Sequence, residues 1–384
     1  MSDIAVVGAG TAGCATALLL ARSGHRVVLF EQAPEPGAAG AGLLLQPTGL
    51  AVLERLGVHE ALLAAGAPID RLRCRTADGR ELLDLRYGVL GPGVHGLGLH
   101  RGDLFHALYD PLAAAGVELR PGTRVRRIDD TAHGVRVAGE GPFDLVVAAD
   151  GARSALRAAY GRVRPYPWGA LWFIGERRGL DADTLDQVVD GTRFLAGVLP
   201  TGRELASLFF SVRADRPREC LARGLDAWRA GLAARHPAAA ALAAQVTDPA
   251  FLQEARYHDV VLPALHRGRV AFIGDAGHAM SPQLGQGANL ALCDAAALAD
   301  CLAATSDVAA ALTRFDAARR AHVRFYGQAS RWMTPFFQSG RNRLAPPRDR
   351  LLGPLSRLPW VGREMVRTMA GMKAGVLRPY RPGP

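Results

Sequence analysis

Apolar and polar positions over the first 31 residues predict a strand, a helix and a second strand. Ile4–Val7 is an unbroken apolar run of strand length, and Arg26–Phe30 is a second run rich in β-branched residues. Between them, an alanine- and leucine-rich segment predicts a helix from Thr11 to Arg22, which Gly24 ends. This order of elements is typical of an α/β fold built on a parallel sheet.

Two later apolar runs, 144–150 and 270–275, each end in an acid. The first ends at Asp150 and the second at Asp275. In open α/β sheets, ligand hydroxyls are bound at the carboxyl ends of the strands, so both acids are candidate binding residues. After Asp275 the chain crosses a proline and several glycines, and then an alanine-rich helix is predicted.

Two segments, 68–98 and 160–260, do not fit this pattern. The first contains short strands with Asp78-Gly79 as a hairpin turn. The second contains strand-like runs at 170–175, 193–199 and 205–212, and an alanine-rich helix over 226–246 that Pro237 interrupts. We expect these segments to form one sheet, with a helix beside it. Strand alternation turns half of its aromatic side chains to each face, and our candidates for lining a pocket are Trp172 and Phe194.

Composition excludes several classes of protein. The chain has 384 residues, of which 49% are hydrophobic, so it can build a large core without disulfides. Its five cysteines are scattered without metal-ligand spacing, which predicts a reducing compartment and no metal site. No apolar run is long enough to span a bilayer, and the N-terminus lacks the basic region of a signal peptide. We therefore expect a cytoplasmic protein.

Positive charge is concentrated at the C-terminal end. Residues 331–384 carry eleven cations against Asp349 and Glu364, which is +9 of the net +10. The remainder is almost neutral, so a broad nucleic-acid-binding face is not expected. Two roles stay open for residues 345–384: packing as a clasp on the rest of the protein, or weak contact with an anionic membrane surface.

The turn after the first strand has dinucleotide-binding spacing. Gly8, Gly10 and Gly13 follow the G-x-G-x-x-G pattern, which allows a tight turn, close approach of a pyrophosphate and close packing of helix on strand. The helix N-terminus favours phosphate charge. Glu31, at the end of the second strand, is placed to accept hydrogen bonds from a ribose. No second fingerprint of this kind occurs, which disfavours a reductase with two dinucleotide domains.

With this fingerprint, the segments ADGARS (149–154) and GDAGH (274–278) make the chain resemble the class A FAD-dependent aromatic hydroxylases of the p-hydroxybenzoate hydroxylase type. Salicylate and ubiquinone-biosynthesis hydroxylases belong to this family. The resemblance implies a Rossmann-like α/β FAD-binding domain with an inserted mixed β-sheet substrate domain and a helical C-terminal segment. The domains expected are 1–67, 99–159 and 261–330 for FAD, 68–98 and 160–260 for substrate, and 331–384 for the C-terminal segment.

The resemblance also implies roles for residues. Arg101 matches an arginine near the flavin pyrophosphate, Asp275 a residue on the ribityl chain, and the segment from Asp150 to Arg153 binds both FAD and NAD(P)H in the family. The loop 34–47 matches one that passes beside the flavin in the family, and Gly40 and Gln46 are candidate contacts there. Non-covalent FAD, with NADPH or NADH as co-substrate, is expected to contact Gly8, Gly10, Ala12, Gly13, Glu31, Gln32, Gly42, Arg101, Asp150, Gly151, Arg153, Gly274, Asp275, Pro282, Gly285, Gln286, Gly287 and Asn289.

The activity implied is an NAD(P)H-dependent monooxygenase that hydroxylates an electron-rich aromatic or polyketide-like small molecule through a flavin C4a-hydroperoxide. The cofactor supplies the chemistry in such enzymes, and no catalytic side chain can be named. His278 is expected to hold a structural hydrogen bond, and Asp294 to face solvent. A monomer or homodimer is expected.

Two other readings stay open. A flavin-dependent reductase or epoxidase would use the same fold. A halogenase is disfavoured because the only lysine, Lys373, lies in the C-terminal segment. A non-catalytic binding protein on this fold would not need both Asp150-Gly151 and Gly274-Asp275.

Overall fold

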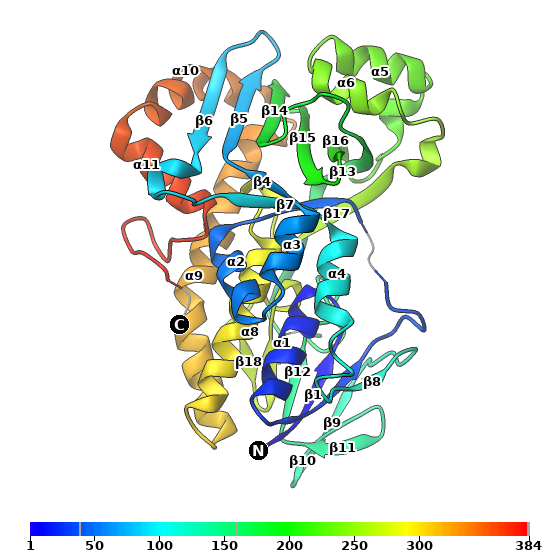
Figure 1. Ribbon diagram of the computed structural model, residues 1–384, viewed down its shortest axis with the longest axis vertical. Coiled ribbons are helices and arrows are strands. Elements are labelled where there is room, and N and C mark those ends of the chain that lie inside the picture. The colour runs from blue at the N-terminus through cyan, green and yellow to red at the C-terminus, as the bar shows by residue number, and fades with distance from the viewer. Residues whose placement is uncertain (38–39, 159, 382–384) are drawn as a thin grey trace.

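The computed structural model describes residues 1–37, 40–158 and 160–381. One of its sheets has six strands and lies in the lower half of the view in Figure 1. Residues 38–39 of the loop 34–47 and 382–384 of the C-terminal segment lie outside the described residues. The strand order is β18-β19-β12-β1-β2-β8, and all neighbours except β18 and β19 are parallel. The strands are β1 (Asp3–Val7), β2 (Arg26–Phe30), β8 (Glu118–Arg120), β12 (Leu145–Ala148), β18 (His266–Arg267) and β19 (Val270–Phe272). The predicted strands at 4–7 and 26–30 are confirmed.

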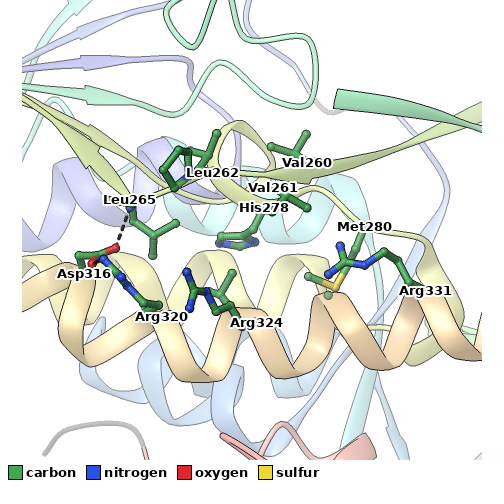
Figure 2. Close-up of a pocket in the computed structure, with 15 residues that line it drawn as sticks. Val260, Val261, Leu262, Leu265, His278, Met280, Asp316, Arg320, Arg324 and Arg331 are labelled. Atoms are coloured by element: carbon green, nitrogen blue, oxygen red, sulfur yellow. Dashed lines mark hydrogen bonds and ion pairs between the residues drawn. The ribbon is translucent and has the colours of Figure 1, made fainter. Parts of the chain in front are cut away.

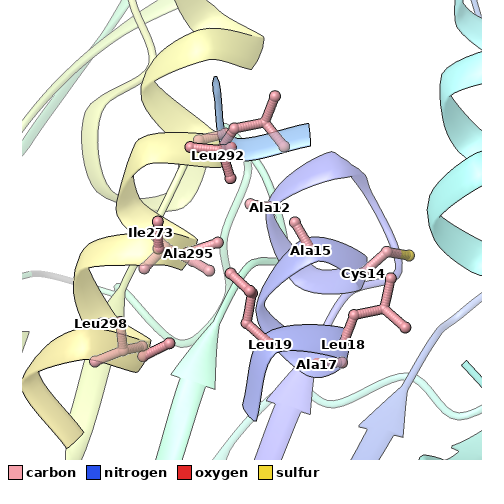
Figure 3. Packing of buried hydrophobic residues seen from close by; sticks show 14 of the residues in the cluster. Ala12, Cys14, Ala15, Ala17, Leu18, Leu19, Ile273, Leu292, Ala295 and Leu298 are labelled. Carbon is pink, nitrogen blue, oxygen red and sulfur yellow. The ribbon is translucent and has the colours of Figure 1, made fainter. Parts of the chain in front are cut away.

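Two helices rich in small residues pack against each other on one face of this sheet. They are α1 (Thr11–Arg22), with the predicted bounds, and α8 (Gly287–Ala303). Figure 3 shows Ala12, Ala15 and Leu19 of α1 facing Leu292 and Ala295 of α8, with Ile273, the residue after β19, beside Ala295. Because alanine side chains are short, the two helix backbones approach closely and bring their N-terminal ends to the same edge of the sheet.

A second, seven-stranded sheet joins the two inserted segments. Its order is β17-β13-β16-β15-β14-β5-β6, and only β14 and β5 are parallel. The hairpin predicted at Asp78-Gly79 joins β5 to β6. The sequence pattern missed β14 and β17, whose alternation is weak. The strands are β5 (Arg71–Thr76), β6 (Glu81–Arg86), β13 (Arg162–Glu176), β14 (Thr184–Asp190), β15 (Phe194–Gly202), β16 (Leu205–Arg213) and β17 (Gln253–Val261).

The two faces of this sheet meet different partners. One face packs on α5 (Leu225–Ala233) and α6 (Pro237–Ala243), the helix pair predicted around Pro237. The other face packs through Leu199 and Phe209 against Leu44 and the C-terminal helices. A substrate bound between the sheet and the glycine motifs therefore meets only this second face.

Two small sheets and several helices complete the middle of the chain. One sheet, order β3-β7-β4, contacts the seven-stranded sheet where a Cβ on Gly98 would lie 1.9 Å from the Pro200 carbonyl oxygen. The elements are β3 (Gly42–Leu45), β4 (Ala67–Ile69), β7 (Gly96–His100), β9 (Ile128–Thr131), β10 (Gly134–Val137), β11 (Glu140–Phe143), α2 (Pro47–Arg55), α3 (His59–Ala65), α4 (Arg101–Tyr109) and α7 (Asp275–His278).

The C-terminal segment is helical and clasps the body of the protein. It follows the long α9 (Val308–Phe337) and contains α10 (Ala345–Ser356) and α11 (Pro359–Met369). The Tyr326 hydroxyl of α9 donates to the Thr368 carbonyl at 2.8 Å, and Val366 and Ala370 are buried in the core. The clasp expected from the sequence is present.

A buried ion pair connects α8, α9 and the sheet. Asp294 and Arg319 have fully buried side chains, and Arg319 Nε donates to Asp294 Oδ1 at 2.8 Å. The other carboxylate oxygen accepts from His278 Nε2 and from the Gly274 N–H. Burial alone raises the pKa of Asp294, but His278 and Arg319 outweigh it and hold that pKa at about 2. The expectation that Asp294 faces solvent is therefore wrong, whereas His278 is the structural hydrogen-bonding residue expected.

The same guanidinium holds the end of the chain. Arg319 Nη1 donates to the Tyr380 hydroxyl at 2.6 Å and to His322 Nδ1 at 2.7 Å. Since arginine only donates, His322 Nδ1 accepts, and its Nε2–H donates to the Gly371 carbonyl at 2.9 Å. Burial and Arg319 lower the pKa of His322 to about 2, so the ring stays neutral.

Replacing Arg319 with methionine removes one partner of a buried pair and leaves the Asp294 charge uncompensated. We expect Arg319→Met to lower the free energy of unfolding by about 3–5 kcal/mol, measured by chemical denaturation. Arg314→Met, at an exposed position of the same helix, is the matched control and is expected to change it by less than about 0.5 kcal/mol. Equal effects of the two substitutions would contradict this account of the pair.

Candidate cofactor and substrate site

The glycines after β1 fall into two groups. A Cβ on Gly13 would lie 1.8 Å from the Gly8 carbonyl oxygen, and one on Gly8 would lie 2.5 Å from the Ala149 oxygen. Packing of the protein itself therefore requires both residues to be glycine. Gly10, by contrast, is exposed and would place its Cβ in open space, and it caps α1 without a side-chain hydrogen bond. Ala12, in the first turn of α1, is buried beneath this loop.

Glu31 lies at the end of β2 and faces the glycine loop. Its Oε2 accepts from the Ala9 N–H at 2.7 Å and its Oε1 from the Ala33 N–H at 2.9 Å. Both bonds fix the carboxylate beside the N-terminal end of α1, where it can accept from a diol. Gln32, the next residue, is exposed at the same edge.

Asp150 ends the strand beside β1, and its two oxygens differ. Oδ2 accepts from the Ala155 N–H at 2.8 Å and so holds the following turn, whereas Oδ1 is buried without a partner among the described residues. Gly151 turns the chain with φ of 79°, and Arg153 is exposed on this turn. A buried, unpaired carboxylate oxygen at this edge is a place for a donor from a bound molecule.

The Gly274-Asp275 turn is fixed by a hydrogen bond to Asp294, the acid of the buried ion pair. Gly274 has φ of 55°, and a Cβ there would approach Ala12 Cβ at 2.9 Å. Its N–H donates to Asp294, so the turn is fixed and leaves the Asp275 side chain exposed. Asp275 thus projects from the carboxyl edge of the sheet, as predicted.

The loop before α8 faces open space. Pro282 is exposed, and Gly285 is in the left-handed region with φ of 59°. A Cβ on Gly285 would come only within 3.9 Å of Gln46 Nε2, and one on Gly287 only within 4.0 Å of an Asp275 oxygen. The protein does not fill the space beside this loop.

Asn289 and Gln286 position this loop, and both are buried. Asn289 Oδ1 accepts from the Gln46 N–H at 2.8 Å, and its Nδ2 donates to the Gly285 carbonyl at 3.0 Å. Gln286 Nε2 donates to the Met369 carbonyl at 2.6 Å and so connects the loop to α11. These side chains therefore shape the site indirectly, because they hydrogen-bond to the backbone that borders it.

Gln46 brings in a residue that the sequence did not single out. Its side chain is fully buried and accepts from the Tyr87 hydroxyl, while its Nε2 has no partner among the described residues. Tyr87 lies in a short 3-10 helix, and no pattern in the sequence marked it. Together these residues keep an amide donor directed toward Gly285.

Arg101 lies against Gly40 and Ala41, and together they line one side of the candidate cofactor site. Arg101 is the first residue of α4 and is exposed, and its backbone N–H donates to the Ala41 carbonyl at 3.3 Å. A Cβ on Gly40 would lie 2.9 Å from Arg101 Cδ. Gly42, by contrast, is buried, and a Cβ there would lie 2.6 Å from Thr201. Gly42 therefore serves the contact with the seven-stranded sheet.

The two aromatic candidates for the pocket lie on opposite faces of that sheet. Trp172 pairs across the strands with Phe209 on the face toward Leu44, and the two rings are 5.2 Å apart. Phe194 packs edge-on against Phe210 on the helical face and lies 5.2 Å from the Arg235 guanidinium. Placing Phe194 in the pocket was wrong, because its position along β15 has the opposite alternation.

Tyr257 of β17, which the sequence analysis missed, joins Trp172. Trp172 Nε1 donates to the Tyr257 hydroxyl at 3.4 Å, and burial raises the pKa of that hydroxyl to about 12. The phenol is therefore protonated at neutral pH and can donate to a bound oxygen. No pattern in the sequence marked this tyrosine, because the alternation of β17 is weak.

Two hollows adjoin these elements. One, of about 340 Å³, lies where the loop around Gly40 meets the sheet and is lined by Gly40, Ala41, His100, Phe173, Ile174, Ala250, Phe251 and Gln253. Figure 2 shows the other, between β17 and α9, with His278 on its wall and Asp316 accepting from the Leu265 N–H. Neither hollow is lined by Trp172 or Tyr257: the first lies at the edge of the seven-stranded sheet beside Gly40 and His100, and the second lies on the α9 side.

These residues fit FAD. Open space lies beside Gly10, Gly285 and Gly287, and the unpaired atoms Asp150 Oδ1 and Gln46 Nε2 adjoin the same edge of the sheet. A helix N-terminus, a ribose-binding acid and a glycine-lined loop follow one another along this edge, in the order in which a dinucleotide presents its parts.

Comparison with known proteins agrees with this geometry. The FAD binding domain family matches residues 1–330. The FAD-dependent urate hydroxylase of Klebsiella pneumoniae is 30% identical over 340 residues, covering 83% of this chain and 86% of the relative. The 3-amino-4-hydroxybenzoate 2-monooxygenase of Streptomyces cremeus is 32% identical over 317 residues, covering 78% of each chain.

Solved structures show the same fold. The crystal structure of Klebsiella pneumoniae HpxO with FAD and uric acid superposes with a TM-score of 0.82 at 26% identity, covering 96% of this chain and 97% of the other. The structure of 2-methyl-3-hydroxypyridine-5-carboxylic acid oxygenase superposes with a TM-score of 0.81 at 23% identity, covering both chains fully. The chain therefore belongs to the FAD binding domain family, as an FAD-dependent monooxygenase of the class A aromatic hydroxylase group.

Proposed function

We propose that this monooxygenase uses NADH or NADPH and O2 to hydroxylate an electron-rich aromatic small molecule. The observation that carries the proposal is the junction of the glycine-lined edge with the aromatic face of the seven-stranded sheet. Bound FAD supplies the redox chemistry when it has been reduced. The relatives that act on urate and on an aminohydroxybenzoate support a small ring as substrate.

The protein is proposed to bind and orient FAD, NAD(P)H and the substrate, and to exclude water from the site. Glu31 accepts from the adenosine ribose, Arg101 neutralises pyrophosphate charge, and Asp275 accepts from the ribityl hydroxyls. The N-terminal end of α8 stabilises negative charge at the flavin edge that it faces, by about 0.3–1 kcal/mol. Arg153 is proposed to hold an anionic part of NAD(P)H.

The substrate ring is proposed to lie against Trp172, with the protonated Tyr257 hydroxyl donating to a ring substituent. An apolar wall excludes water from the reacting position. The cytoplasm is the proposed location, supported by five cysteines that form no disulfide.

Rapid mixing tests the reaction. The bound flavin is reduced anaerobically with NADH or NADPH and then mixed with oxygenated buffer, and absorbance is followed. We expect a transient species distinct from reduced and oxidised flavin, which decays faster with one member of a panel of phenols and hydroxylated nitrogen heterocycles. Reoxidation with no transient species under any condition would favour a reductase instead.

Glu31→Gln removes the charge of the proposed ribose acceptor. We expect FAD to bind about tenfold to a hundredfold more weakly, about 1.4–2.8 kcal/mol, measured by quenching of flavin fluorescence. Glu35→Gln, at an exposed position four residues later, is the control with the same chemical change. A dissociation constant within twofold of the parent for Glu31→Gln would remove Glu31 from the site.

Trp172→Ala removes an aromatic wall of the proposed substrate position. With the best substrate of the panel, we expect KM to rise about tenfold, about 1.4 kcal/mol, while FAD affinity stays unchanged. Phe194→Ala makes a similar change on the opposite face of the sheet and is expected to leave KM unchanged. Equal KM values for the two variants would place the substrate elsewhere.

A further inference from the structure

Exposed apolar side chains are concentrated at one end of the chain. Thirteen large hydrophobic residues are exposed among those described, and eight of them lie between residues 332 and 377. Single exposed hydrophobic residues are normal on a protein surface, but a local concentration marks an interaction site. The C-terminal helices therefore have more hydrophobic side chains than their packing on the rest of the protein buries.

Six of these residues form one surface, the α10–α11 edge. Leu351, Leu355 and Leu358 follow helical spacing along α10 and just past its end, and Trp360, 64% exposed, begins the next helix. The remaining members are Val376 and Leu377, 75% and 76% exposed.

The loop that carries Val376 lies against α11. Lys373 Nζ bonds both the Glu364 carboxylate and the Val376 carbonyl oxygen, and Glu364 is one helical turn after Trp360. Figure 1 shows α10, α11 and the red loop after them together at one outer edge of the molecule. The elements that carry the six exposed residues therefore lie along one edge of the molecule.

Arginines alternate with these apolar residues along the segment. Arg350, Arg363, Arg378 and Arg381 are exposed, and the described residues offer them no ion-pair partner. The two acids of the segment are already engaged, Asp349 by Arg348 and Glu364 by Arg367 and Lys373. The edge therefore exposes apolar side chains together with unpaired cations.

The positive charge of the α10–α11 edge distinguishes between two possible partners, a second copy of this chain and a lipid bilayer. A second copy of this chain would place the same cationic edge against itself across a two-fold axis, which is unfavourable. Tryptophan and leucine flanked by arginine are instead suited to the boundary between lipid headgroups and acyl chains. Across residues 1–37, 40–158 and 160–381, no helix is long and apolar enough to cross a membrane.

We propose that the α10–α11 edge binds the surface of an anionic lipid bilayer. Trp360 and the leucines insert among the headgroups, and the free arginines pair with lipid phosphates. The other end of α11 contacts the loop before α8, where the Met369 carbonyl accepts from Gln286 Nε2. The bilayer would thus meet one end of α11, and the loop before α8 meets the other.

Flotation of the FAD-bound protein with vesicles tests this proposal. We expect binding to vesicles of phosphatidylcholine mixed with phosphatidylglycerol, little binding to phosphatidylcholine alone, and weakening by salt. Arg350→Gln with Arg363→Gln is expected to lower the partition coefficient about 25-fold, about fivefold per arginine. Leu358→Ser with Trp360→Ser is expected to lower it at least about tenfold.

Matched variants keep the test specific. Arg126→Gln with Arg127→Gln removes the same charge from an exposed site elsewhere, and Val163→Ser removes an exposed apolar side chain from β13. Both controls are expected to bind anionic vesicles as the parent does, with flavin absorbance and melting temperature unchanged in all variants.

Three results would overturn the proposal. They are absence of binding to anionic vesicles, equal binding to both kinds of vesicle, and parent-like binding by the edge variants. Sedimentation velocity identifies the alternative occupant, because a self-associating edge would lose its dimer in Leu358→Ser with Trp360→Ser. An acidic polypeptide that binds this edge when vesicles do not would point to a protein partner.

Discussion

The buried carboxylate of Asp294 is the constraint on which the arrangement of the site depends. A charge with no access to water is tolerated only when every oxygen is satisfied, and here Arg319, His278 and the Gly274 N–H do so. These partners come from α9, α7 and the turn before α7. Because the carboxylate needs all of them, the turn that exposes Asp275 cannot shift without leaving a buried charge unpaired.

This network extends in two directions from Arg319. Toward the sheet it fixes the Gly274 turn, and toward the end of the chain it holds Tyr380, whose ring stacks on neutral His322 with centroids 3.5 Å apart. Gln286 makes a parallel connection from the loop before α8 to Met369. The C-terminal segment is therefore part of the cofactor site's scaffold, although it supplies no residue of the fingerprint.

The sequence pattern predicted those features that depend on residues close together in the chain. The bounds of α1 and β2 followed from apolar runs and Gly24, and the outward position of Asp275 followed from the end of a buried run. The burial of Asp294 could not be read in this way, because its partner Arg319 lies 25 residues later on another helix. The prediction for Phe194 has a related difficulty. Alternation assigns side chains to two faces of a sheet, but only the tertiary fold determines which face is turned toward the cofactor. Tyr87 and Tyr257 depend on such contacts too.

The glycines show how far a motif can be interpreted physically. Gly8 and Gly13 are required by the protein's own backbone, so their presence alone would be satisfied by any tight strand-to-helix turn. Gly10, Gly285 and Gly287 meet little or no protein within 4 Å, and of these Gly285 alone has an unusual backbone angle. Neither packing nor backbone strain requires glycine at Gly10 or Gly287, but the same is true of Gly37, Gly88, Gly231 and Gly340. Gly10 and Gly287 support a cofactor site because of their neighbours: Gly10 follows Ala9, which Glu31 holds, and Gly287 lies beside Asp275. Gly8 and Gly13 hold the turn that presents this edge of the sheet.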